Sequence, residues 1–192
     1  MKYMQWIALS AAAAGVAACC IGCARPGGKE ASASQKLGGS FTAEMIMEME
    51  DLTASGTVSR IGEGQWSVAF AEPASLAGVV LDFSGDTVSA SYQGLGFSVP
   101  QSAMPAKSVL VSLIQAVDTL AKEEKITGTE KEGKICITEE LDGSPYTLSL
   151  TKSGDLAGFS VENMDASLTF SAFQSGAAPI ATMTAALETT AP

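Results

Sequence analysis

Apolar and polar residues alternate along most of the chain between residues 41 and 172. In residues 41–49 the odd positions are apolar and the even positions are polar, with Ile46 as the exception. A two-residue period packs one face of a strand on a core and leaves the other in water, as in antiparallel sheets. The same alternation recurs at Trp66/Val68/Phe70, Val79/Leu81/Phe83, Val88/Ala90/Tyr92, Leu95/Phe97/Val99, Ile135/Ile137, Tyr146/Leu148/Leu150 and Leu168/Phe170/Ala172.

Short turn sequences separate these alternating segments. They are rich in Gly, Ser and Asp, which are the residues that tight turns favour. The turns are Gly62-Glu63-Gly64, Ser84-Gly85-Asp86, Gly133, Asp142-Gly143-Ser144-Pro145 and Ser153-Gly154-Asp155. Short connections between alternating runs predict hairpins, and the pattern predicts about nine to eleven strands in meander order.

Residues 105–125 have a different period. Their apolar residues recur at the three- and four-residue spacing of an amphipathic helix. Pro105 suits the first helical turn, and Lys122 and Lys125 complement the negative end of the helix dipole. Because the apolar stripe has to be buried, we expect this helix to cover one face of the sheet. The stripe comprises Val109, Leu110, Leu113, Ile114, Val117, Leu120 and Ala121.

The order of these segments resembles the LolA/LolB-like class of bacterial lipoprotein carriers and related exported lipid-binding lipoproteins. The resemblance rests on a long first strand rich in Met, on residues 66–73 (WSVAFAEP) and 76–78 (LAG), and on the hairpins and helix that follow. It implies a curved antiparallel sheet or half-open β-barrel that is covered by the amphipathic helix. Carriers of this class hold acyl chains on the concave, apolar face beneath the helix.

Seven apolar side chains are therefore candidates for lining a hydrophobic-ligand site. Methionine is flexible and polarizable, which suits a surface that adapts to varied apolar ligands. The alternative is that the same side chains pack beneath the helix as a closed core without a cavity. The candidates are Met45, Met47, Met49, Trp66, Phe70, Leu81 and Phe83.

The first 25 residues have the composition of an export signal. Lys2 is followed by an uncharged, mostly apolar run and then by Val16-Ala17-Ala18-Cys19. This tetrapeptide resembles the bacterial lipobox, in which the Cys receives a diacylglyceryl group and the signal is cut just before it. We therefore expect a signal peptide over residues 1–18 and lipidation at Cys19, with Cys23 as the second choice. The alternatives are a retained membrane helix and an ordinary cleaved secretory signal.

Low-complexity segments flank the predicted β domain, which we place at residues 40–175. Residues 24–39 consist mostly of Gly, Ser, Ala and Lys, so we expect residues 19–39 to form a lipidated N-terminus and a flexible tether. Residues 176–192 are rich in Ala and Thr, and we expect a disordered tail there. Two or three acyl chains on one residue would hold the protein firmly on the extracytoplasmic face of the cell membrane.

The chain is acidic, with a formal net charge of −10. This charge makes it a poor partner for nucleic acid, and it favours solubility of an exported domain or contact with a cationic protein partner.

The residue types needed for catalysis are scarce. The sequence contains no His, which removes the commonest general base and the commonest zinc ligand. Cys136 lies between Ile135 and Ile137 and is expected to be an inert, strand-buried thiol. Acidic residues cluster at 123–124 and 139–142, where solvated surface charge is the usual explanation and a weak calcium site the alternative. We therefore predict no catalytic residues, no metal site and no cofactor.

The sequence thus predicts a mainly β, membrane-anchored lipoprotein that is not an enzyme. Its predicted function is to bind a lipid or acyl chain in the concave face of the sheet. The alternative is an envelope protein-interaction module with a closed core and no small-molecule ligand.

Overall fold

A computed structural model describes residues 29–103, 108–141, 143–162 and 164–176. Twelve antiparallel strands form one sheet in the spatial order β1-β8-β9-β10-β11-β12-β2-β3-β4-β5-β6-β7. The elements are β1 (Glu30–Ala33), β2 (Phe41–Met49), β3 (Leu52–Gly62), β4 (Gln65–Glu72), β5 (Val80–Ser84), β6 (Thr87–Tyr92), β7 (Leu95–Pro100), the 3₁₀ turn η1 (Gln101–Ala103), α1 (Val109–Leu120), β8 (Ile126–Lys131), β9 (Lys134–Leu141), β10 (Ser144–Thr151), β11 (Leu156–Val161) and β12 (Ala166–Ser175).

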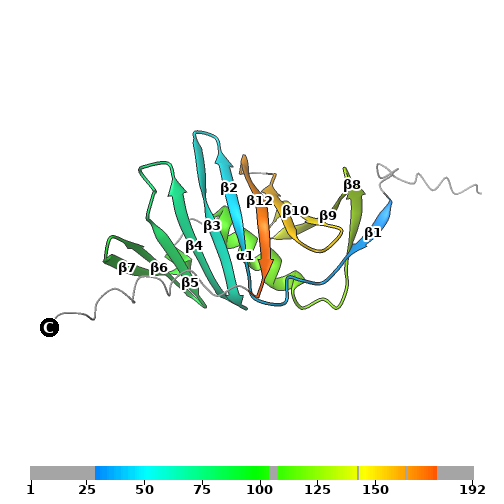
Figure 1. Cartoon of the computed structure of the whole chain (residues 1–192), viewed down its shortest axis with the longest axis horizontal. Coiled ribbons are helices and arrows are strands. Elements are labelled where there is room, and N and C mark those ends of the chain that lie inside the picture. The colour runs from blue at the N-terminus through cyan, green and yellow to red at the C-terminus, as the bar shows by residue number, and fades with distance from the viewer. Residues whose placement is uncertain (1–28, 104–107, 142, 163, 177–192) are drawn as a thin grey trace, which may run out of the picture.

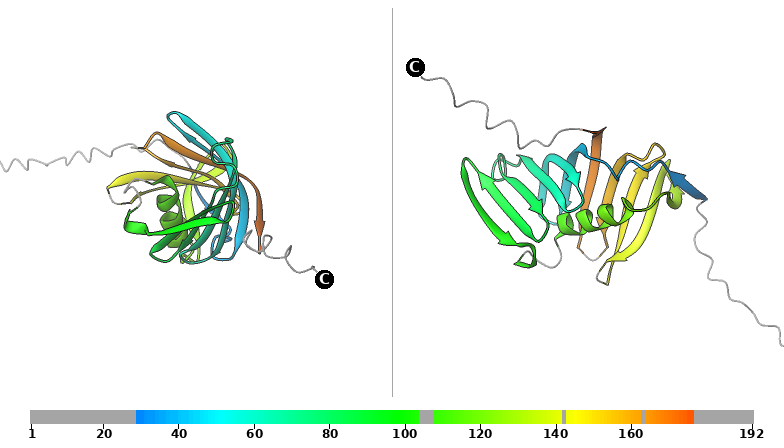
Figure 2. Two further views of the ribbon diagram at one scale, coloured as in Figure 1. Left: turned by 90° about the vertical axis from the view of Figure 1, so that its left-hand side faces the viewer. Right: turned by 90° about the horizontal axis from the view of Figure 1, so that it is seen from below.

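Two meanders make up the sheet. One runs from β2 to β7 and the other from β8 to β12, and the pairing of β12 with β2 joins them. The sheet stays open, with β7 at one edge and β1 at the other (Figure 1). The chain passes from the β7 edge to the second meander through α1, and the sheet curls around this helix (Figure 2). The predicted fold class, a curved antiparallel sheet covered by one amphipathic helix, is therefore confirmed.

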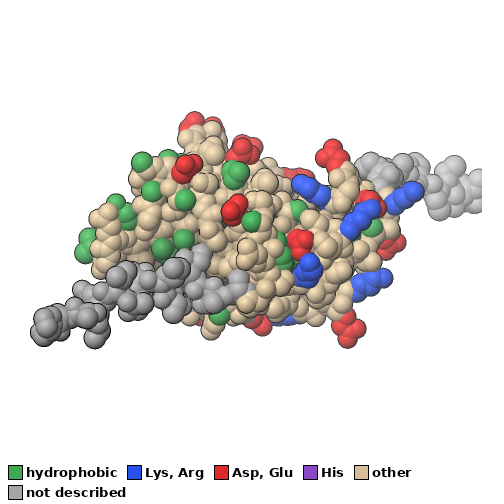
Figure 3. Space-filling model, in the orientation of Figure 1, with side chains coloured by type: hydrophobic (Ala, Val, Ile, Leu, Met, Phe, Trp, Pro, Cys, Tyr) green, Lys and Arg blue, Asp and Glu red, His purple; other side chains and the backbone are tan. Residues whose placement is uncertain are grey.

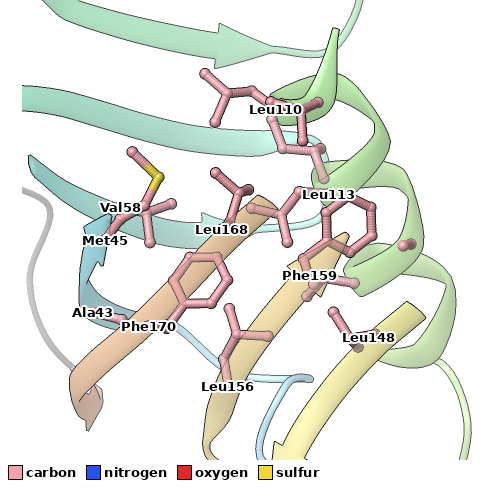
Figure 4. Packing of buried hydrophobic residues seen from close by; sticks show 14 of the residues in the cluster. Ala43, Met45, Val58, Leu110, Leu113, Leu148, Leu156, Phe159, Leu168 and Phe170 are labelled. Atoms are coloured by element: carbon pink, nitrogen blue, oxygen red, sulfur yellow. The ribbon is translucent and has the colours of Figure 1, made fainter. Parts of the chain in front are cut away.

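The concave face of the sheet carries the core. On β2 the buried positions are Phe41, Ala43, Met45 and Met47, which is the predicted alternation, and Ile46 points away from them and is exposed. The helix packs its own apolar stripe on this face. Figure 4 shows Leu110 and Leu113 of α1 close to the buried side chains of β11 and β12. The helix is therefore fixed by burial of its apolar stripe.

The N-terminal segment departs from the prediction. Residues 30–33 form β1, which pairs with β8, and Leu37 is fully buried. The prediction of a flexible tether is thus wrong for residues 30–39. Ala33 and Leu37 supply buried apolar area that the composition of the segment conceals. Gly154 leaves room for the segment, because a Cβ at that position would collide with the backbone oxygen of Ser34.

The predicted order and helix bounds also need correction. A single meander does not account for the pairing of β12 with β2, which brings the two ends of the domain together. The helix spans 109–120, whereas we predicted 105–125. At its C-terminal end the amide of Lys122 bonds to the carbonyl of Thr119, a tighter turn that ends the helix. Pro105 lies outside the described residues.

Candidate functional site

The concave face extends beyond the part of the sheet that α1 covers. Cross-strand neighbours form a continuous row over five strands, from Val58 of β3 through Val68, Leu81 and Ala90 to Phe97 of β7. Residues that are directly opposite in an antiparallel sheet project from the same face. The face that forms the core under the helix therefore continues to the free edge at β7.

Burial changes sharply along this row. Val58 and Val68 are buried, Leu81 and Ala90 are half-buried, and Phe97 is 67% exposed. At the tip of the β6–β7 hairpin, Tyr92 is 44% exposed and Leu95, its cross-strand neighbour, is 77% exposed. We call this part of the concave face the open wing; it consists of Leu81, Ala90, Tyr92, Leu95, Phe97 and Val99.

The open wing is exposed because the helix is too short to cover the whole sheet. The 12 residues of α1 span about 18 Å at the rise of an α-helix. Twelve strands at about 4.8 Å spacing extend more than twice that distance along the arc of the sheet. The helix therefore leaves one end of the concave face without a cover.

The open wing is also almost uncharged. Between residues 80 and 100 the only Asp, Glu, Lys or Arg residues are Asp82 and Asp86. Asp82 pairs with Ser89 on the convex face, and Asp86 lies in the β5–β6 turn. In Figure 3 the Lys and Arg side chains gather over the opposite end of the molecule, around β1 and β8. The open wing thus differs in charge from the rest of a strongly acidic domain.

The seven predicted lining residues fall into two groups. Met45, Met47, Trp66, Phe70 and Phe83 are buried in the core. Leu81 is half-buried and belongs to the open wing, whereas Met49 is exposed at the end of β2. The structure therefore places only Leu81 of the seven on the uncovered surface, and Phe83 and Phe70 lie on the same sheet face beside it.

A buried polar cluster lies between the helix and the sheet. The Arg60 Nε atom donates to Asp118 Oδ1 at 2.8 Å, and the two side chains are 4% and 11% exposed. Asp118 Oδ2 also accepts hydrogen bonds from the Gly64 amide at 2.8 Å and the Trp66 indole at 3.2 Å. The cluster joins α1 to β3 and β4.

Arg60 links the cluster to the N-terminal segment as well. Its Nη1 atom donates to the carbonyl oxygens of Gly38 and Gly39, at 3.1 and 2.9 Å. Each buried charge is therefore paired or hydrogen-bonded, which is the condition for a buried ion pair to be tolerated. The sequence pattern did not predict this cluster, although Arg60 interrupts the inward-facing positions of β3 and Asp118 interrupts the apolar stripe of α1.

Open clefts flank the helix on both sides. One, of about 270 Å³, is lined by Phe83 and Ile114 and by the polar side chains of Asp118 and Lys122. The other, of about 290 Å³, lies at the end of α1 beside β8 and β9 and includes Glu123 and Glu139 in its lining. Both linings mix apolar and charged groups, so neither cleft resembles the largely apolar pockets that small hydrophobic ligands occupy.

Ion pairs and burial shift the pKa values of four side chains. The exposed pair of Glu63 and Lys122 lowers the pKa of the carboxyl and raises that of the ammonium, chiefly through their hydrogen bond. The hydrogen bond from Lys36 lowers the pKa of Asp155, and Ser153 adds to the effect. Burial raises the pKa of Tyr146, whose hydroxyl donates to Glu139. These shifts arise from structural contacts, and the groups do not converge on one cleft.

The remaining predicted sites have different outcomes. Cys136 is half-buried, with its Sγ atom 3.6 Å from the Ser149 hydroxyl. Among the described residues no three or more Cys, Asp or Glu side chains are grouped so that they could hold a metal ion. Cys19 and Cys23 lie outside the described residues. So do residues 177–192, which make up nearly all of the predicted disordered tail. No helix within the described ranges has the length and apolar character to span a bilayer.

Comparisons with known proteins support the fold and go no further. No family model matches the sequence, and no curated protein matches it. An uncharacterized conserved protein from Thermus thermophilus has a similar structure, with a TM-score of 0.50 and 14% identity over 76% of this chain and 83% of its own. At that identity the similarity concerns the fold alone.

Two weaker similarities are to proteins with more informative names. A LolA superfamily protein from Nitrosomonas europaea has a TM-score of 0.34 and 10% identity, covering 73% of this chain and 87% of its own. A putative outer membrane lipoprotein-sorting protein domain from Vibrio parahaemolyticus has a TM-score of 0.38 and 11% identity, covering 74% of this chain and 87% of its own. The open curved sheet around one helix is the architecture that the LolA/LolB-like resemblance implies.

Proposed function

We propose that this protein is an exported, lipid-anchored lipoprotein that binds an acyl chain or similar apolar ligand on the open wing. The observation that carries the proposal is the exposure of Leu95 and Phe97 on a sheet face that is otherwise the core of the domain. Water contact with large apolar side chains is unfavourable, and contiguous exposed apolar patches commonly mark binding sites.

The chemistry of the open wing suits an acyl chain. Each methylene transferred from water to an apolar surface contributes about 0.8 kcal/mol, so a chain of several methylenes along this surface would bind usefully. The absence of Asp, Glu, Lys and Arg on the concave side of residues 80–100 removes the cost of desolvating a charge there. Binding of this kind needs no catalytic group, and we propose no enzymatic activity.

The anchoring part of the proposal rests on the sequence at Cys19. The described chain begins at Lys29, which precedes β1 at one edge of the sheet. The open wing lies at the opposite edge, on β7 (Figure 1).

Native mass spectrometry of the protein purified from expressing cells tests the ligand. We expect the parent chain to carry a co-purifying lipid, and Phe97→Asp to lose at least nine-tenths of it, because the new carboxylate would have to be desolvated beneath the acyl chain. The matched control is Ile46→Asp, since Ile46 is a comparably exposed apolar residue (49%) on the convex face. Equal lipid occupancy in the two variants, or none in the parent, would contradict the proposal.

The intact mass of the same preparation tests the anchor. We expect the mass of a chain that begins at a diacylglyceryl-modified Cys19. Cys19→Ser should remove that modification and release the protein from the membrane fraction or leave it unprocessed, whereas Cys23→Ser should have no effect. Loss of the modification in Cys23→Ser instead would move the site to the second choice.

A further inference from the structure

We propose that two copies of this protein associate through the free edge of β7, forming a two-fold symmetric, continuous antiparallel sheet. The inference goes beyond ligand binding and does not depend on it. The two edge strands of the sheet, β1 and β7, differ in how well they are protected against pairing with another chain.

The β1 edge has the features that prevent pairing with another chain. It is four residues long, begins with the charged residue Glu30 and directly follows Lys29. Natural sheets protect their edges with short strands, charged side chains, prolines or bulges. The β7 edge is six residues long, carries no charge, and has its only proline at its last position, Pro100. It is the less protected of the two edges.

The hairpin geometry shows which backbone groups of β7 the pairing with β6 does not use. Gln93 and Gly94 have φ angles of 49° and 81°, the left-handed conformations of a type I′ two-residue turn. Tyr92 and Leu95, which flank that turn, are a hydrogen-bonded pair, and hydrogen-bonded and non-bonded pairs then alternate along the ladder. The N–H and C=O groups of Gly96 and Ser98 therefore point away from β6, toward the open edge.

These free groups specify a register for self-association. An antiparallel pair of β7 strands with its axis at Phe97 places Gly96 opposite Ser98 of the second copy, so that both residues use both backbone groups. Phe97 then faces its own symmetry mate, and Leu95 faces the mate of Val99. Centring the pair on Ser98 would instead place Gly96 opposite Pro100, which has no N–H to donate.

Side chains and charge fit the same arrangement. On the concave side, each exposed apolar residue of β7 meets an apolar residue of the other copy, the self-complementarity that a two-fold interface requires. On the convex side, Gly96 and Ser98 are too small to interfere. Because β7 is uncharged, two chains of net charge −10 can approach there without opposing carboxylates. The two open wings would adjoin and form one longer apolar surface.

Cysteine crosslinking of the full chain in the membranes of expressing cells tests this register. We expect Phe97→Cys to give a disulfide-linked dimer under mild oxidation, since directly opposite non-bonded residues have Cα atoms about 4.5 Å apart. Leu95→Cys combined with Val99→Cys should also crosslink. Leu95→Cys alone should not, because the two copies of residue 95 would be about 14 Å apart.

Two controls make the result decisive. Ile46→Cys places a thiol at an exposed apolar position of the convex face and reports any crosslinking through Cys136 or the N-terminal cysteines. Ser98→Pro, added to Phe97→Cys, removes an outward N–H and should reduce the dimer at least fivefold. A dimer yield for Phe97→Cys no higher than for Ile46→Cys would overturn the proposal. Equal yields for Leu95→Cys alone and the double variant would also overturn it, because they would show unspecific association.

Discussion

Two regions of one sheet face have the same alternating sequence pattern and opposite surroundings. Beneath α1, positions such as Val58 and Leu168 are buried by the helix. On the open wing, Leu95 and Phe97 hold equivalent inward-facing positions and are in contact with water. The alternation determines which side chains share a face, but the reach of the covering helix determines which of them become core.

A polar cluster holds α1 on the part of the sheet that it covers. Asp118 of α1 binds Arg60 of β3, the Trp66 indole and the Gly64 amide. These directional bonds fix where the helix lies on the sheet, whereas apolar contacts alone are non-directional. The cluster therefore helps to determine which part of the concave face the helix covers.

Removing the acidic member of the cluster should have the largest effect. We expect Asp118→Ala to lower the free energy of unfolding by about 3–5 kcal/mol, because the buried Arg60 guanidinium would lose its counter-charge. Denaturant titration followed by circular dichroism measures the change. Asp82→Ala, on the convex face of β5, is the control and should stay within about 0.5 kcal/mol of the parent. Equal losses in the two variants would contradict the role of the cluster.

Leucine truncations compare the two regions directly. We expect Leu113→Ala, which empties a fully buried position on α1, to cost about 2–5 kcal/mol. Leu95→Ala on the open wing removes the same atoms from an exposed position and should change stability by less than about 0.5 kcal/mol. If Leu95→Ala proved as costly as Leu113→Ala, the open wing would have to be buried in solution.

A smaller, pH-dependent effect should appear where the N-terminal segment meets the covered region. Lys36 lowers the pKa of Asp155 below its ordinary value, so the contact contributes stability above a pH of about 4 that is lost as the pH falls through the lower, folded pKa. We expect Asp155→Asn to show a shallower loss of stability on acidification. Thermal unfolding at a series of pH values between neutral and acid measures this difference, and identical profiles would contradict it.

Much of the covered region could be predicted from the sequence. Strand alternation identified Met45, Met47, Trp66 and Phe70 as inward-facing, and the helical period identified the buried stripe of α1. These predictions succeed because a two-residue or 3.6-residue period is a local property of the chain.

The features that create the candidate site are not local. The exposure of Leu95 and Phe97 depends on the 12-residue length of α1 and on β7 being an edge strand, and neither follows from alternation. The Arg60–Asp118 pair joins residues 58 positions apart, and β1 pairs with a strand almost a hundred residues later. Sequence patterns contain no information on such pairings without a fold to bring the residues together.

Labelling with a photoactivatable fatty acid tests the central claim most directly. The full chain is irradiated in the membranes of expressing cells with the probe, and the labelled peptides are mapped by mass spectrometry. If the open wing binds acyl chains, the label should concentrate on residues of β6 and β7, including Tyr92, Leu95 and Phe97, and excess unlabelled fatty acid should remove it. Label confined to other strands, or insensitive to this competition, would contradict the account.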